Sequence, residues 1–304
     1  MKRLLPCLAA IVLLVACGQT YEEQKRLTRA QQRKLWLQDS AAFKVAVMPT
    51  LDCLPLFLAK EHGMFEKHGV DIRLKRYTAQ MDCDTALERG RVEAGVTDLV
   101  RAERMQGKDT SLIYIAPTNA YWQLYTNRNA RIKELKQLDD KMVAMTRYSV
   151  TDLLSDLVID SAKLDRDRVF RIQVNDVNVR IGMLLGNEMD AMWLTEPQAT
   201  LAKQARHNML TDTRKLDIQM GVLVACKRPQ KDSTRRHQLE VLKKVYNQAC
   251  DSINQLGIRH YGDIVAKYCQ IKPALIDSLP RLKYPKMGAP RQQDVERAQK
   301  WLKK

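Results

Sequence analysis

The sequence predicts an α/β fold of two similar lobes joined by a hinge. The chain of 304 residues is long enough for two domains of about 150 residues each. From Phe43 onward, short apolar strands alternate with segments of helical periodicity, as in parallel α/β layers. Short motifs recur at an offset of about 97 residues, which indicates two units with the same order of elements. With 45% hydrophobic and 28% charged residues, the composition excludes a disordered chain and a polytopic membrane protein.

The first 16 residues have the pattern of a signal peptide. A basic start precedes an apolar run from Leu4 to Ala16, which is too short to cross a bilayer of about 30 Å as a helix. The run ends in Leu14-Val15-Ala16-Cys17-Gly18, which resembles the lipobox of bacterial lipoproteins. We therefore expect cleavage before Cys17, acylation of its thiol by a fatty acid such as palmitate, and anchoring on the periplasmic or cell-surface side of a bacterial membrane. The alternative is an ordinary cleaved signal peptide that ends in cysteine.

The chain is strongly basic, with 51 Lys and Arg against 35 Asp and Glu, a formal net charge of +16. Loss of Lys2 and Arg3 with the signal peptide leaves +14. An exported protein does not normally meet genomic DNA, and no nucleic-acid recognition spacing is present. We therefore expect no nucleic-acid partner, and we attribute the charge to solubility and to attraction for anionic lipid headgroups.

The cysteines and histidines do not have the spacing of a metal or redox site. There is no C-x-x-C and no H-E-x-x-H pattern, so we expect neither a metal nor a cofactor. The cysteines of the body are expected to be structural pairs or inert buried thiols, and two disulfides are conceivable, Cys53 with Cys83 and Cys250 with Cys269. Outside the signal peptide and Cys17, the cysteines are Cys53, Cys83, Cys226, Cys250 and Cys269.

Residues 17–42 are rich in Gln, Lys, Arg and Glu and are predicted to be a tether, partly helical. The first lobe then follows as alternating strands and helices, each helix ending near a glycine. The predicted elements are strands at 45–48, 70–74, 94–96 and 112–116, with helices at 55–62 and 85–89.

The internal repeat predicts the second lobe. Lys44-Val45-Ala46-Val47-Met48 matches Lys141-Met142-Val143-Ala144-Met145, 97 residues later. Gly90 to Ala94 resembles Gly186 to Ala191, and Thr97-Asp98 is followed 98 residues later by Thr195-Glu196. Three matches in nearly one register favour two lobes with the same order of strands and helices.

The chain is expected to cross between the lobes twice. It leaves the first lobe near 116–120 and returns near 221–226, and long helical segments follow at 233–256 and 290–302. We therefore assign 43–118 and 222–304 to lobe 1 and 119–221 to lobe 2. Two crossings of this kind make a hinge.

Several short motifs follow one another along residues 43–226: Pro55 to Ala59, Gly63-Met64-Phe65, Gly69 to Ile72, Ala86 to Gly90, Glu93 to Asp98, Ile132 to Leu138, Lys141 to Met145, Gly186 to Ala191 and Thr195-Glu196-Pro197. The order of these motifs resembles that of one family, the type II periplasmic substrate-binding proteins of ABC transporters, in the branch that binds nitrate, taurine, alkanesulfonates and thiamine precursors. The resemblance implies two Rossmann-like lobes, a small-molecule ligand in the cleft between them, delivery to an ABC permease, and a monomer without a cofactor.

The candidate ligand-binding residues lie where predicted strands end, because ligands of parallel sheets bind beyond the carboxyl ends of the strands. Ser149 also begins a predicted helix with a capping-box pattern, whose free N–H groups, with Arg147, suit an anionic edge. The full set is Asp52, Asp82, Asp98, Asn119, Arg147, Tyr148, Ser149, Asp176, Trp193 and Glu196.

Acidic residues dominate this set, with Arg147 as its one obvious cation. This pattern favours an amine or a thiamine-precursor pyrimidine over a simple inorganic anion, with Tyr148 and Trp193 available to stack on a ring. Other interpretations stay open. Asp82, Asp98 and Asp176 could each be a helix N-cap, and Ser149 could serve as a cap only. Arg147 could face solvent, and Trp193 could belong to the hydrophobic core.

The function expected from these features is that of a lipid-anchored solute receptor that is not an enzyme. Within the same class, the alternative ligands are nitrate, sulfonates and taurine. An enzyme on the same fold, of the thiamine-pyrimidine or menaquinone type, is a second class, but export and the lack of a nucleophile–base pattern argue against it. A non-transport lipoprotein that serves in assembly or adhesion is the third.

Overall fold

The computed structural model describes residues 29–108, 110–227 and 232–303. The predicted signal peptide and Cys17 lie outside the described residues. The chain forms two units, residues 1–42 and residues 43–304. In the first unit, α3 (Arg29–Ala41) is helical, as predicted for part of the tether. No helix in the described ranges is long and apolar enough to span a membrane.

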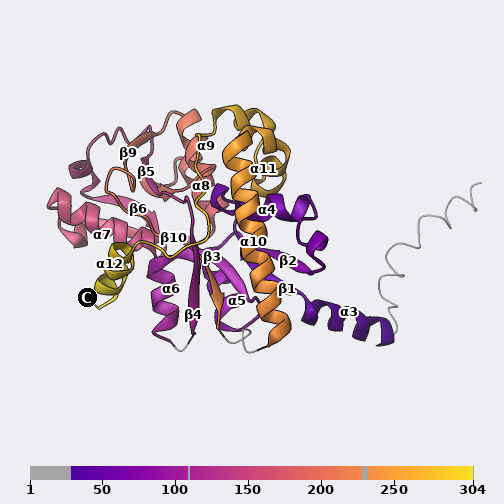
Figure 1. The fold of residues 1–304 in the computed structure, drawn as a ribbon. Helices are drawn as coiled ribbons and strands as arrows, with labels where there is room; N and C mark the ends of the chain where they lie inside the picture. The colour runs from indigo at the N-terminus through magenta and orange to yellow at the C-terminus, as the bar shows by residue number, and fades with distance from the viewer. Residues whose placement is uncertain (1–28, 109, 228–231, 304) are drawn as a thin grey trace, which may run out of the picture. The chain divides into compact units, whose positions relative to one another are not determined.

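The second unit contains two five-stranded sheets (Figure 1). The first sheet has the order β2-β1-β3-β10-β4. In it β1 pairs in parallel with β2 and β3, while β10 runs antiparallel between β3 and β4. The bounds are β1 Phe43–Val47, β2 Ile72–Arg76, β3 Ala94–Asp98, β4 Leu112–Pro117 and β10 Gly221–Cys226. Because β10 enters the middle of this sheet, the chain returns to it after building the second sheet.

The second sheet repeats this arrangement with the order β7-β6-β8-β5-β9. Its first parallel strand, β6, pairs with β7 and β8, as β1 pairs with β2 and β3, and β5 runs antiparallel between β8 and β9. The bounds are β5 Gln123–Thr126, β6 Lys141–Met145, β7 Val169–Gln173, β8 Ala191–Leu194 and β9 Asn208–Asp212. The predicted fold of two similar α/β halves is confirmed, and Lys44 and Lys141 lie in equivalent strands.

Helices cover the two sheets. Those that follow strands of the first sheet are α4 Leu54–Glu61, α5 Gln80–Glu88 and α6 Leu99–Gln106. Those of the second sheet are α7 Val150–Ala162, α8 Val177–Leu185 and α9 Gln198–Gln204. The C-terminal segment adds α10 Ser233–Leu256, α11 Gly262–Cys269 and α12 Gln292–Leu302. α10 packs against α4, and α12 packs against α6 and α7 (Figure 1).

Short 3₁₀ turns join several of these elements. They are η2 Leu51–Cys53, η3 Glu66–His68, η4 Leu135–Leu138, η5 Arg166–Arg168, η7 Ile258–Tyr261 and η8 Pro273–Ser278. The first of them matters for the site, because η2 follows β1 directly and buries Asp52 at the end of that strand.

Local sequence explains most helix limits. α4 has Pro55 in its first turn, where the missing N–H costs nothing, and the chain turns at Gly63 with φ of 59°. Asp232 caps α10 by accepting hydrogen bonds from the N–H groups of Thr234 and Arg235. The predicted helix at 233–256 has the observed bounds. α5, in contrast, begins at Gln80 instead of at residue 85.

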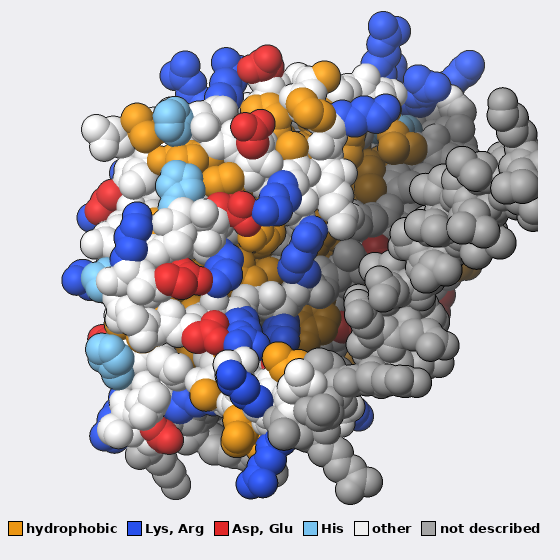
Figure 2. Space-filling view, turned by 90° about the vertical axis from the view of Figure 1, so that its right-hand side faces the viewer, with side chains coloured by type: hydrophobic (Ala, Val, Ile, Leu, Met, Phe, Trp, Pro, Cys, Tyr) orange, Lys and Arg blue, Asp and Glu red, His pale blue; other side chains and the backbone are white. Residues whose placement is uncertain are grey.

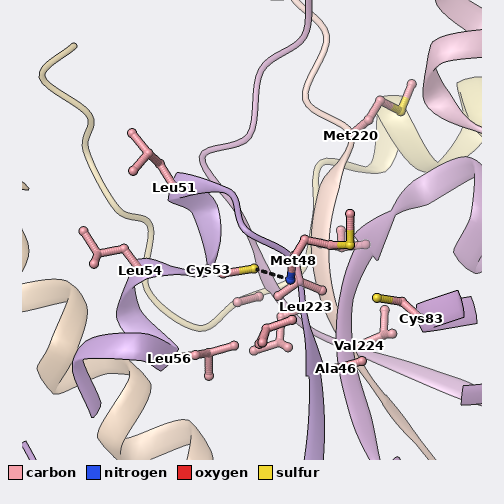
Figure 3. Packing of buried hydrophobic residues seen from close by; sticks show 14 of the residues in the cluster. Ala46, Met48, Leu51, Cys53, Leu54, Leu56, Cys83, Met220, Leu223 and Val224 are labelled. Atoms are coloured by element: carbon pink, nitrogen blue, oxygen red, sulfur yellow. Dashed lines mark hydrogen bonds between the residues drawn. The ribbon is translucent and has the colours of Figure 1, made fainter. Parts of the chain in front are cut away.

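The five cysteines of the body are buried, and no disulfide joins them in the described residues. Both conceivable disulfides were therefore wrong, and the alternative of buried thiols is confirmed. Cys53 Sγ accepts a hydrogen bond from Met48 N at 3.5 Å, while Cys83 lies apart from it on another element (Figure 3). Burial raises the pKa of the Cys53 thiol, which keeps it protonated.

Positive charge is spread over the surface on the face shown in Figure 2. Lys and Arg side chains lie at several separate places there, with Asp and Glu side chains between them. On that face the basic side chains therefore do not form the continuous stripe that tracks a nucleic-acid backbone.

Candidate functional site

A small cavity of about 70 Å³ lies between the two sheets, at the carboxyl ends of their parallel strands. Pockets for organic ligands usually measure about 300 to 1,000 Å³, so this cavity is smaller than the usual ligand site. We call it the inter-sheet cavity. Its polar lining comes from both halves and includes Thr50, Asp52, Gln80, Thr97, Asp98, Arg101, Thr146, Ser149, Thr151, Asn175, Arg180, Thr195 and Gln198.

Arg101 of α6 is the most unusual residue of the inter-sheet cavity. Its side chain is 1% exposed. Nη1 donates to the carboxylate of Asp84, and Nε lies 3.2 Å from Asp98 Oδ2. Among the described residues, Nη2 has no hydrogen-bond partner. A buried guanidinium N–H without an acceptor is costly, so this nitrogen marks a place where an acceptor of a ligand fits.

A second unpaired group lines the same cavity. Gln198, at the start of α9, is 2% exposed, and its Nε2 donates to Pro49 O at 3.1 Å. Within the described part of the chain, its Oε1 has no donor. The inter-sheet cavity therefore offers both a free donor and a free acceptor, which suits a ligand with polar groups of both kinds.

Asp98 and Asp176 both cap helices, and both join the two halves. Asp98 caps α6 and also accepts a hydrogen bond from Val150 N of α7 at 3.2 Å. Asp176 caps α8 and accepts from Thr78 Oγ1 of the first half. The cap interpretation is thus confirmed for these two residues. Each carboxylate also forms a hydrogen bond between the two halves. Asp98 lines the inter-sheet cavity, whereas Asp176 does not.

Burial raises the pKa of Asp98 from 3.8 to about 6, against the opposing effect of Arg101. The folded state therefore binds this proton more strongly than the unfolded chain, and Asp98 lowers the free energy of unfolding as pH rises from about 4 to about 6. Asp98→Asn keeps an oxygen for both backbone N–H groups but does not titrate. We expect the stability of the native protein relative to this variant to fall over that pH range, measured by urea denaturation at each pH.

Asp82→Asn is the control, because Asp82 is exposed on α5 and its carboxylate accepts no hydrogen bond from the residues that the structure describes. Its stability relative to the native protein is expected to stay constant over the same range. The quantity compared is the free energy of unfolding of the native protein minus that of Asp98→Asn. If this difference is constant or grows as pH rises, the pKa of Asp98 is not raised in the folded protein.

Asp52 and Glu196 differ in their relation to the cavity. Asp52 lines it and accepts a hydrogen bond from Thr118 Oγ1 at 3.2 Å, and burial raises the pKa of its carboxyl group. Glu196 does not line it. The Glu196 carboxylate accepts from Tyr121 OH and Gln123 Nε2, both at 2.9 Å, and from Thr200 N and Oγ1. Glu196 is thus occupied in holding its own half together, and the neighbouring Thr195 faces the cavity instead.

Three lining residues of the second half are held by hydrogen bonds within that half. Ser149 caps α7 and donates to Thr146 O at 2.6 Å. Trp193 is fully buried and donates through Nε1 to Ser155 Oγ, so the core interpretation holds although its ring contributes to the lining. Arg180 donates to Val174 O, Trp193 O and Thr146 Oγ1, and burial lowers its pKa to about 10. These contacts leave Arg101 as the more available cation.

The remaining predicted residues lie elsewhere. Asp82 is exposed in the first turn of α5, Asn119 lines a neighbouring cavity of about 480 Å³, and Arg147 and Tyr148 line another of about 750 Å³. Of the predicted set, the inter-sheet cavity brings together Asp52, Asp98, Ser149 and Trp193. The binding roles of all these residues stay predictions. Sequence reasoning missed Arg101, although its position three residues after a strand-end Asp is a usable signal.

No group of three or more His, Cys, Asp and Glu side chains in the described ranges is arranged to hold a metal ion. The polar lining of the inter-sheet cavity consists mainly of hydroxyl, amide and guanidinium groups, with the carboxylates of Asp52 and Asp98. Such a lining recognises hydrogen-bond donors and acceptors of a small molecule.

The fold defines a class of α/β proteins in which two similar halves enclose a cavity between their sheets. Residues 50–229 match the model of the NMT1/THI5-like family, and the chain belongs to that family. The predicted resemblance to the type II periplasmic binding proteins is confirmed. No curated protein matches the sequence.

Solved structures share the fold at low sequence identity. The alkanesulfonate-binding protein SsuA from Xanthomonas axonopodis pv. citri, bound to MOPS, is 17% identical with a TM-score of 0.70, over 86% of this chain and 91% of that one. The aliphatic sulphonate binding protein SsuA from Escherichia coli is 18% identical, with a TM-score of 0.68 over 86% and 87%. The nitrate-binding protein NrtA from Synechocystis PCC 6803 is 14% identical, with a TM-score of 0.64 over 77% and 68%.

Proposed function

We propose that this chain is the solute-binding protein of an ABC importer, anchored to a membrane through Cys17. Lobe 1 (43–118 and 222–304) and lobe 2 (119–221) close on a small organic molecule, and the closed form delivers it to the permease. Family membership, the two-lobed fold and the inter-sheet cavity support this function. Periplasmic binding proteins for sulfonate and nitrate share the fold.

The observation that carries the proposal is the unpaired Nη2 of the buried Arg101 in the inter-sheet cavity. Arg101 requires a hydrogen-bond acceptor, while Gln198 Oε1 and the Asp52 carboxyl group favour a donor. The ligand proposed therefore has an amine-type donor and an acceptor on one small frame, as a thiamine-precursor aminopyrimidine does. Taurine also has both groups and is the leading alternative, whereas nitrate has only acceptors.

Catalysis is the competing class on this fold. No histidine or cysteine lines the inter-sheet cavity in the described residues, and the Ser149 hydroxyl is held by the backbone and by Thr151. Binding without chemical change therefore fits the site better than nucleophilic catalysis does. A non-transport lipoprotein is the third class of function. The neighbouring genes distinguish it from a transport receptor, because the gene of a transport receptor is expected to lie beside permease and ATPase genes.

The test of the proposed function is to identify what the protein binds. Gently purified protein is denatured, and the released small molecules are identified by mass spectrometry. We expect a stoichiometric amine or aminopyrimidine that rebinds with a micromolar or lower Kd in calorimetry. Conversion of that molecule by the protein would instead support an enzyme. Binding of nitrate alone would contradict the ligand assignment.

The lipid anchor has a test of its own. Cys17→Ser removes the thiol that receives the lipid, so we expect no incorporation of a fatty-acid probe in metabolic labelling, and accumulation of unprocessed precursor. Cys7→Ser is the matched control, because Cys7 lies within the predicted signal peptide, and it is expected to leave labelling unchanged. Labelling that persists in Cys17→Ser would show that the anchor assignment is wrong.

A further inference from the structure

A larger cavity of about 750 Å³ lies apart from the inter-sheet cavity, against α6, α7 and α12. The three helices lie side by side in Figure 1. Its residues come from both halves of the chain and include Trp301 of α12. A volume of this size is within the usual range for sites that bind organic molecules. We call it the α12 cavity.

The lining of the α12 cavity is strongly basic. Asp152 and Asp156 are its only acidic lining residues in the described part of the chain, and both are already paired with Arg171, at 3.2 and 2.9 Å. Arg147 and Lys108 are exposed and have no ion-pair partner among the described residues. The basic lining residues are Arg104, Lys108, Arg147, Arg166 and Arg171. The cavity therefore has free positive charge for an anion.

Two aromatic side chains line the same cavity. Tyr148 is 55% exposed, and the guanidinium carbon of Arg104 lies 5.8 Å from the centroid of its ring. Trp301 Nε1 donates to Asp156 Oδ2 at 2.9 Å, which fixes the indole. Tyr148 also has φ of 54°, a left-handed conformation that is rare for a bulky residue, and its N–H donates to Asp152 Oδ2. The loop thus presents an aromatic ring where glycine or asparagine is the usual residue.

We infer that the α12 cavity binds a planar organic anion, an aromatic or heteroaromatic ring that carries a phosphate, sulfonate or carboxylate. The ring lies against Tyr148 and Trp301, and the anionic group meets Arg147 and Lys108. This site is separate from the proposed solute site, and the inference does not depend on the identity of that solute. Because α6 and α7 belong to different halves, a bound anion favours the arrangement in which the halves are close.

Calorimetry with 1-naphthyl phosphate tests this site directly. Inorganic phosphate and 1-naphthol, which lack the ring and the charge respectively, are each expected to bind at least tenfold more weakly. Arg147→Ala is expected to weaken binding of 1-naphthyl phosphate about five- to tenfold. Tyr148→Gly, which removes the ring at a φ that glycine adopts freely, is expected to weaken it at least fivefold.

Two control variants locate the binding. Lys203→Ala removes an exposed positive charge on α9, and Asn175→Ala alters the inter-sheet cavity, so both are expected to leave the affinity for 1-naphthyl phosphate unchanged. A loss in Asn175→Ala without one in Arg147→Ala would place the probe in the inter-sheet cavity and overturn the inference. Equal losses in Lys203→Ala and Arg147→Ala, or no saturable binding at millimolar probe, would also overturn it.

Discussion

Arg101→Met is expected to lower the free energy of unfolding by about 3 to 5 kcal/mol. The reason is that Asp84 and Asp98, 2% and 3% exposed, would stay buried while losing the guanidinium that Arg101 places beside both carboxylates. Removing one member of a buried ion pair costs more than the pair contributes, because an uncompensated charge remains. Urea denaturation followed by circular dichroism measures the effect.

Arg104→Met is the matched control on the same helix. Arg104 lies 3.9 Å from Asp84, and its side chain is 22% exposed, so its loss is expected to cost less than about 1 kcal/mol. Adding Asp84→Asn to Arg101→Met is expected to recover part of the lost stability, since it removes one of the uncompensated charges. A loss below 1 kcal/mol for Arg101→Met, equal to that of Arg104→Met, would show that Arg101 does not neutralise these carboxylates.

The sequence predicted the fold well because the strands are marked by local apolar patterns and because this pattern recurs in the second half. The apolar strands that begin near Lys44 and Lys141 each pair with two parallel neighbours, and the offset between them reflects two halves of the same order. The return of the chain to the first half near 221–226 was also expected, and β10 lies there. The insertion of β10 between β3 and β4, however, depends on strand pairing that no local pattern specifies.

The site was predicted less well, for two physical reasons. α5 begins at Gln80 after Ala79, which offers no side-chain cap, so the sequence contained no start signal. Asp82 was therefore placed before the helix predicted at 85–89, whereas it lies in the first turn of α5. Glu196 was expected at the cleft from its place after a strand. Its partners Tyr121 and Gln123 come from β5 and the segment before it, more than 70 residues earlier, and only the folded structure shows that they occupy it.

Arg101 also changes the chemistry inferred for the ligand. The sequence argument counted Arg147 as the cation among acidic residues, yet Arg147 lines the α12 cavity and Arg101 lines the inter-sheet cavity. Arginines are usually exposed, whereas Arg101 is buried beside Asp84 of α5. Sequence periodicity did not predict this contact between α5 and α6. The ligand proposed therefore needs an acceptor as well as a donor.

Arg101→Lys is expected to lower affinity for the solute by about tenfold to a hundredfold while the protein stays folded. A lysine ammonium keeps a positive charge near Asp84 and Asp98, but it lacks the planar fork that presents Nη2 to the cavity. The expected loss corresponds to one charge-assisted hydrogen bond, about 1.5 to 3 kcal/mol. Calorimetry with aminopyrimidines of the thiamine pathway, taurine, alkanesulfonates and nitrate measures it.

Arg104→Lys is the control for this result, because Arg104 lies on the same helix but lines the α12 cavity instead of the inter-sheet cavity. Its affinity for the solute is expected to stay within twofold of the native value. If Arg101→Lys also binds the solute with native affinity, then Nη2 does not contact it, and Arg101 serves only to neutralise its two carboxylates. If Arg101→Lys loses affinity for a sulfonate but no amine or aminopyrimidine binds even the native protein, the receptor function stands with a sulfonate as its ligand.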